Sequence, residues 1–115
     1  MKIKAYLTGG SDLNALRLVT LPEAELEGVK PYENKADLVN FLDSVFTYGQ
    51  NDFQPLPGVR SLMVGDLIEF NGSYHLIQSH GFKTLTEAEM DDYMALSPDD
   101  RRWSHFCRPR PKGGK

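Results

Sequence analysis

The dipeptide Asn71-Gly72 constrains the fold of this chain more than any other feature of its sequence. It separates two short runs rich in strand-forming residues, Leu67–Phe70 and Tyr74–Ile77. Asn-Gly supplies the positive φ angles that a tight turn between antiparallel strands requires. The sequence therefore predicts a β-hairpin in which Phe70 pairs with Ser73. A three-residue loop with a left-handed glycine is the alternative.

The segments on either side of this hairpin carry further turn signals. Val64-Gly65-Asp66 is typical of a turn that leads into the first strand, and Gly81 predicts a bend or bulge before Phe82 re-enters the sheet. The proline-rich stretch 54–58 cannot be the interior of a helix, so we expect an extended connection anchored by Phe53 and Leu56. A polyproline ligand for another domain is the alternative for this stretch.

Two more strands are expected near the N-terminus. In Met1–Leu7, apolar residues alternate with lysine and tyrosine, which is the pattern of a half-buried strand. Leu16–Leu21 predicts a second strand, and Pro22–Glu27 has the proline and acids of a short helical turn. The glycines Gly9-Gly10 lack the longer loop and the Lys-Ser/Thr ending of a phosphate-binding loop, so we interpret them as a turn.

Two helices are predicted from apolar spacing and capping residues. Asn34–Tyr48 begins with a residue that can cap a helix, and its apolar residues recur at helical spacing. Thr86–Leu96 begins with a capping box, and Ser97-Pro98 predicts a further short helix. The expected fold is therefore α+β: a small, mainly antiparallel sheet, open or partly closed into a barrel, with the two main helices on one face.

Length and charge define the expected organisation. The 115 residues suffice for one domain, which we place at residues 1–106. Residues 1–100 hold seven basic and sixteen acidic residues, a net charge of −9, whereas residues 101–115 hold six basic residues and no acid. Residues 107–115 are therefore predicted to form a flexible basic C-terminal tail. No apolar run suits a membrane helix or a signal peptide and the single cysteine allows no internal disulfide, so a cytoplasmic location is expected.

Few residues in the sequence point to catalysis or to metal binding. His75, His80, His105 and Cys107 do not have the spacing of a zinc site. His105 and Cys107 could share one side of an extended segment, but no third group that would orient such a pair is apparent. We therefore expect a protein that is not an enzyme and that carries no metal or cofactor.

Two candidate binding segments follow from the same reading. Basic and aromatic residues near the C-terminus have the composition of a site for single-stranded nucleic acid or for a partner; the residues are Arg101, Arg102, Trp103, Arg108, Arg110 and Lys112. A solubilising tail, with Trp103 and Phe106 packed on the core, is the alternative. The polar loop Gln50-Asn51-Asp52 is a second candidate, as an exposed contact for a partner.

Parts of the chain resemble the YodL-like domains, small domains encoded by phages, plasmids and other mobile elements. The resemblance is carried by Phe46, Asn51, the run Ser61–Ile68 and the pair Gly81-Phe82. It implies an accessory protein of a mobile element and assigns no catalytic residue. The expected function is non-catalytic binding of a host or self-encoded macromolecule, with a protein as the expected partner, nucleic acid as an alternative through the tail, and no membrane.

A second resemblance concerns the hairpin. The run Val64–Phe70, followed by a strand and then Thr84–Glu87, is similar to the ASCH domains of the PUA-like barrels. This similarity implies RNA binding and gives the first alternative function. A third possibility is an acidic inhibitor that imitates nucleic acid, because the first hundred residues carry a net charge of −9.

Overall fold

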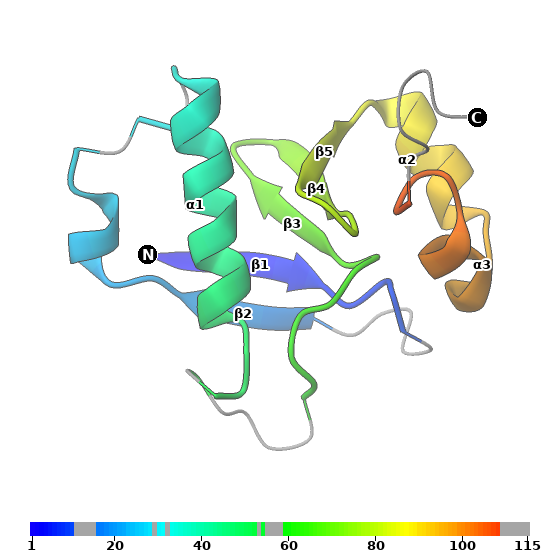
Figure 1. Cartoon of the computed structure of the whole chain (residues 1–115), viewed down its shortest axis with the longest axis horizontal. Coiled ribbons are helices and arrows are strands. Elements are labelled where there is room, and N and C mark those ends of the chain that lie inside the picture. The colour runs from blue at the N-terminus through cyan, green and yellow to red at the C-terminus, as the bar shows by residue number, and fades with distance from the viewer. Residues whose placement is uncertain (11–15, 29, 32, 53, 55–58, 109–115) are drawn as a thin grey trace.

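Five antiparallel strands form one open sheet, in the order β2-β1-β3-β4-β5, in the computed structural model of the chain (Figure 1). The structure describes residues 1–10, 16–28, 30–31, 33–52, 54 and 59–108. The strands are β1 (Lys2–Tyr6), β2 (Leu16–Thr20), β3 (Leu67–Phe70), β4 (Ser73–Ile77) and β5 (Phe82–Leu85). The predicted α+β fold is confirmed. The barrel alternative is wrong, because β2 and β5 are the two edges of the sheet and do not pair.

The hairpin at the centre of the sequence forms as predicted, with the shorter of the two expected loops. Asn71 and Gly72 have φ angles of 52° and 76°, and Phe70 pairs with Ser73. Both central residues are thus left-handed, which matches the twist of the flanking strands and fixes their register. Gly81 also has a positive φ and ends the turn from β4 into β5, so the expected bend is confirmed.

The three α-helices begin where the capping residues indicate. The helical elements are the 3-10 helix η1 (Glu23–Leu26), α1 (Lys35–Tyr48), α2 (Glu87–Met94) and α3 (Pro98–Trp103). The side chain of Asn34 accepts a hydrogen bond from the Ala36 amide at 2.9 Å. Thr86 and Glu89 form the complete capping box at α2. Ser97 caps α3 in the same way. These caps pair amide groups that have no partner inside a helix, which explains why the start of each of the three α-helices can be read from sequence.

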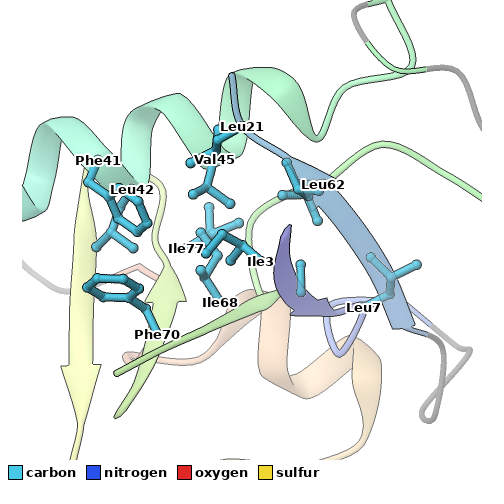
Figure 2. Packing of buried hydrophobic residues seen from close by; sticks show 12 residues of the cluster. Ile3, Leu7, Leu21, Phe41, Leu42, Val45, Leu62, Ile68, Phe70 and Ile77 are labelled. Carbon is cyan, nitrogen blue, oxygen red and sulfur yellow. The ribbon is translucent and has the colours of Figure 1, made fainter. Parts of the chain in front are cut away.

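Helix α1 covers one face of the sheet and forms the larger apolar core with it (Figure 2). The ring of Phe41 from α1 lies 4.3 Å, centroid to centroid, from the ring of Phe70 on β3. Ile3, Val19, Ile68 and Ile77 contribute the inward side chains of the strands to the same core. Removing these apolar side chains from water is the main force that holds the helix on the sheet.

The opposite face of the sheet packs against α2 and the C-terminal segment. Leu67 and Leu76 follow the alternation of the strands and point away from α1. They form a second core with Tyr93 of α2 and with Phe106. The expectation that both main helices lie on one face is therefore wrong. The central strands β3 and β4 carry consecutive apolar residues, such as Leu67-Ile68, and these need cover on both faces.

The packed domain extends beyond the boundary expected at residue 106. Cys107 is fully buried, and its backbone oxygen accepts a hydrogen bond from the Ser79 amide at 2.8 Å. Arg108 contacts α3. The expected tail 109–115 and the expected anchors Phe53 and Leu56 lie outside the described residues.

Candidate binding surfaces

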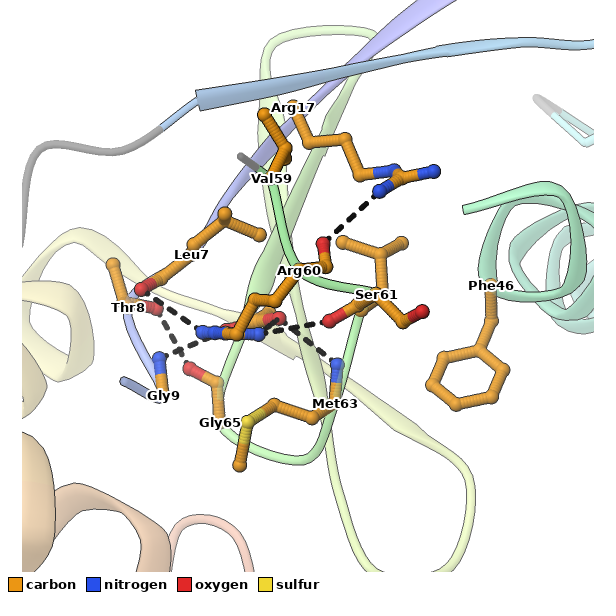
Figure 3. A network of polar contacts seen from close by, with 12 residues as sticks. Leu7, Thr8, Gly9, Arg17, Phe46, Val59, Arg60, Ser61, Met63 and Gly65 are labelled. Atoms are coloured by element: carbon orange, nitrogen blue, oxygen red, sulfur yellow. Dashed lines mark hydrogen bonds and ion pairs between the residues drawn. The ribbon is translucent and has the colours of Figure 1, made fainter. Parts of the chain in front are cut away.

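A network of polar contacts fixes the segment that precedes β3 (Figure 3). The Asp66 carboxylate is fully buried, and Arg60 donates to both of its oxygens at 2.8 Å. The amides of Gly9 and Met63 each donate to it at 2.9 Å. Four donors therefore saturate the carboxylate. The network joins the loop after β1 to the turn before β3, and it leaves Asp66 no free lone pair for a ligand.

The single cysteine lies in a buried contact rather than in a reactive site. Its Sγ is 3.6 Å from the hydroxyl of Tyr93, which also donates to the backbone oxygen of Gly65. Burial raises the pKa of both the Cys107 thiol and the Tyr93 hydroxyl. The thiolate is the nucleophilic form of cysteine, so this environment disfavours nucleophilic chemistry.

The histidines do not assemble with the cysteine. His105 is exposed whereas Cys107 is buried, so the two side chains do not share one side of their segment. His75 is buried, its Nδ1 lies 2.8 Å from the Thr84 hydroxyl, and burial lowers the pKa of its imidazole. Across the described ranges, no three residues among His, Cys, Asp and Glu lie together as metal ligands would.

Arg101 does not belong to the basic site predicted from sequence. Only 2% of this residue is exposed. Its guanidinium donates to the backbone oxygens of Tyr93, Thr8 and Met94, at 3.2, 3.2 and 2.8 Å. These bonds satisfy carbonyl groups at the end of α2 and tie α3 to the loop after β1. Arg101 therefore stabilises the fold, and the prediction that it contacts nucleic acid or a partner is corrected.

The other predicted basic residues are only partly available. Arg102 forms an ion pair with Asp99 on the same helix. Trp103 is 72% exposed, and the Arg108 guanidinium lies 4.4 Å from the centre of its ring. The alternative expectation is therefore wrong for Trp103, which is not packed on the core, but it is confirmed for Phe106, which is buried there. The pair Trp103 and Arg108 is what the described structure retains of the predicted site; Arg110 and Lys112 lie outside the described residues.

The predicted partner loop consists mainly of structural side chains. Gln50 donates to the backbone oxygens of Phe46 and Leu62, both at 3.0 Å. Asn51 donates to the Val59 oxygen at 2.9 Å and accepts from Arg17 at 2.8 Å. Asp52 is exposed. Gln50 and Asn51 therefore hold the segment 59–62 in place, which corrects the expectation that they are free for a partner.

Arg17 is a structural residue that the sequence analysis missed. It lies on edge strand β2 and is only 1% exposed. Its guanidinium donates to Asn51 and to the backbone oxygens of Gln54 and Arg60, at 2.8, 2.5 and 3.0 Å. Burial lowers its pKa. The only signal in the sequence was that the alternation of β2 places Arg17 on the same side as the apolar Val19. Arginine is also common on strands that face water, so this signal alone did not identify a buried residue.

On the sheet face opposite α1, no helix in the described part of the chain packs over the exposed residues of β1 and β2 that point that way. On β2, Leu16 and Leu18 are 44% and 46% exposed, and they point away from the core that contains Val19. On β1, Lys2 and Lys4 are exposed beside them, with Lys4 paired to Leu18. We call these four residues the β1–β2 surface.

Two cavities lie on the α1 side of the sheet, near the other edge. One has a volume of 210 Å³ and includes Asp43, Phe46 and Phe82 in its wall. The other also has a volume of 210 Å³ and includes Leu38 and Thr84. Helix α1 therefore leaves space beside β5 at both of these positions.

Comparison of the chain with protein-family models, with curated proteins and with solved structures yields no match. The two family resemblances seen in the sequence therefore stay predictions. None of the helices in the described part of the chain combines the length and the apolar character needed to cross a membrane.

Proposed function

We propose that this chain is a non-catalytic accessory protein of a phage or another mobile element, which acts in the cytoplasm by binding another protein. The resemblance to YodL-like domains supports the mobile element. The observation that carries the binding role is the β1–β2 surface, where two leucines stay nearly half exposed on a part of the sheet face that neither α1 nor α2 covers.

The chemistry of this surface favours a protein partner with an acidic rim. Leu16 and Leu18 are two residues apart on one strand and therefore lie side by side on the same face. Lys2 and Lys4 border them and are exposed. A small apolar centre with a basic border is complementary to an apolar side chain surrounded by carboxylates.

The absence of catalysis is proposed from where the reactive side chains lie. Cys107 and His75 are buried, and the carboxylate of Asp66 is saturated by four donors. A general base or a nucleophile must reach its substrate, which these three side chains do not.

Affinity capture from a lysate of the native host, read by quantitative mass spectrometry, tests the proposal. The bait variant combines Leu16→Ser with Leu18→Ser, and Val39→Ser on α1, which is 38% exposed, is the matched control. We expect a protein whose recovery falls at least tenfold with the double variant but not with the control. If the double variant and the Val39→Ser control recover every captured protein equally, the β1–β2 surface is not the binding site.

A second candidate function is binding of single-stranded nucleic acid at Trp103 and Arg108. The observation that favours it is the exposed indole with a guanidinium stacked on it, because exposed rings stack on bases and arginine contacts phosphate. Fluorescence anisotropy of labelled single-stranded RNA and DNA tests it with Arg108→Gln, and Lys35→Gln on α1 is the control. Binding that is equal in both variants would place the site elsewhere and favour the PUA-like alternative. If neither RNA nor DNA binds at low salt, nucleic-acid binding is excluded. The protein-binding proposal and the acidic inhibitor that imitates nucleic acid then remain.

A further inference from the structure

The outer edge of β5 presents unpaired backbone groups. The Ile77 backbone bonds to the β3 side, donating to Asp66 and accepting from Gly65, both at 2.9 Å. Hydrogen-bonded and non-bonded pairs alternate along antiparallel strands, so Phe82, the partner of Ile77, directs its N–H and C=O away from the sheet. Thr84, two residues further along β5, also directs its N–H and C=O away from the sheet. In the described ranges, no other segment pairs with this edge.

The two cavities lie over these same two residues. Phe82 forms part of the wall of the first cavity and Thr84 part of the wall of the second. Helix α1 supplies the facing wall, through Phe46 in the first and Leu38 in the second. Each cavity thus lies between helix α1 and the edge strand β5.

Phe82 and Thr84, which line the two cavities, are one side-chain repeat apart on β5. Residues two apart on a strand are separated by about 6.6–6.8 Å and project from the same face. A peptide that pairs with β5 has the same repeat, so alternate side chains of that peptide would lie over the two cavities. The backbone groups of Phe82 and Thr84 would take up the main-chain hydrogen bonds of the peptide.

The charge at the first cavity indicates the side chain that it would accept. Phe46 and Phe82 supply apolar rings, and the exposed carboxylate of Asp43 stands at the same cavity. Asp43 has no ion-pair partner among the residues that the structure describes. A lysine or arginine would lay its aliphatic stem on the rings and pair its cation with this carboxylate.

The second cavity suits a smaller polar side chain. Its wall combines Leu38 and Phe70 with the Thr84 hydroxyl and with the buried imidazole of His75. A threonine or serine could place its hydroxyl near these polar groups and its carbon atoms near the apolar ones.

We infer that β5 binds an extended segment of a partner protein as a sixth strand, with a lysine or arginine over the first cavity and a small hydroxyl residue over the second. This surface is distinct from the β1–β2 surface, so the inference goes beyond the proposed function and does not depend on it. The net charge of −9 over residues 1–100 also favours a basic segment.

Selection of a yeast-displayed library of linear twelve-residue peptides against the folded protein tests this inference. We expect enriched peptides to carry a basic residue two positions from threonine or serine, within a run of strand-forming residues. In a nuclear magnetic resonance titration with a synthetic enriched peptide, the amides of Phe82 and Thr84 should shift, and their hydrogen exchange should slow. The amides of Lys83 and Leu85 already bond to β4, so their exchange should change little.

Two variants test the charge. Asp43→Lys should lower the affinity of the protein for the peptide at least tenfold. A peptide with glutamate in place of its basic residue should bind that variant more tightly than the original peptide does. Asp92→Lys is the matched control, because Asp92 is an exposed acid on α2, across the sheet. Methylating the peptide nitrogens that bond to β5 should also lower the affinity of the peptide at least tenfold. Methylating the alternate nitrogens, which point away from β5, should leave the affinity unchanged.

Three outcomes would overturn the inference. The first is that the selection enriches no peptide, and the second is that the resonance shifts map to residues away from β5 and α1. The third is that Asp43→Lys and Asp92→Lys bind the peptide with equal affinity. Melting curves of both variants establish that each is folded before it is used.

Discussion

Arg60 and Asp66 form a bidentate ion pair in which two guanidinium nitrogens lie 2.8 Å from the two carboxylate oxygens. The Asp66 side chain is fully buried and the Arg60 side chain is 32% exposed. The pair therefore closes the segment 60–66, which leads directly into β3, and the amides of Gly9 and Met63 complete the hydrogen bonding of the carboxylate.

We predict that Asp66→Asn lowers the free energy of unfolding by about 3 kcal/mol, at the low end for a broken buried pair because Arg60 can reach water. The new amide also turns a donor toward a backbone N–H that needs an acceptor. Urea denaturation measures the loss, with the exposed Asp52→Asn as control. A loss below about 1 kcal/mol would mean that the pair contributes little.

The loop after β1 should not tolerate a side chain at Gly9. A Cβ at this position would lie 2.5 Å from the backbone oxygen of Val64, whereas a Cβ at Gly10 would first meet the side-chain end of Arg60 at 3.0 Å. We expect Gly9→Ala to destabilise by about 2–3 kcal/mol and Gly10→Ala by less, because a side chain yields more readily than backbone. Equal losses in thermal denaturation would show that this approach relaxes without strain.

The hairpin turn gives a smaller effect. Gly72→Ala forces a side chain into a φ of 76°, which we expect to lower the free energy of unfolding by about 1 kcal/mol. Ser73→Ala, next to the turn, is the control. A melting temperature unchanged by Gly72→Ala would contradict the role assigned to this turn.

Truncation after Phe106 should destabilise the domain. It removes the buried Cys107 and leaves the Ser79 amide without its acceptor, so a loss of about 2 kcal/mol or more is expected. Truncation after Arg108 keeps every contact described above and is the matched control. Identical melting temperatures for the two truncated chains would show that Cys107 contributes nothing to the fold.

Stability should decrease when the pH falls below about 6.5. Burial lowers the pKa of His75 from its usual 6.5, so the unfolded chain takes up a proton at a higher pH than the folded chain does. The contribution of His75 to the free energy of unfolding is then constant above this range and declines from about pH 6.5 down to the folded pKa. His75→Asn should flatten the melting temperature between pH 7.5 and 5.5, whereas the exposed His105→Asn should not. Parallel curves for the two variants would exclude His75 as the cause.

What the sequence by itself determined is local. The turn at Asn71-Gly72, the caps at Asn34 and Thr86 and the start of α3 at Pro98 each depend on groups within three residues of one another. Backbone sterics and unpaired amide groups act over that distance, so a residue type at a given position is enough to predict them.

The tertiary structure alone decided which faces the helices cover and which polar side chains are free. Arg101 bonds to Thr8 across 93 residues, and Arg17 bonds to Asn51 across 34. In the sequence, Arg101 belongs to the basic stretch 101–115 and Asn51 to a loop predicted to be exposed. Folding buries or occupies both side chains, because carbonyl groups from distant segments need donors once they leave water. The edge of β5 and its two cavities likewise arise only from the order of the strands and the position of α1.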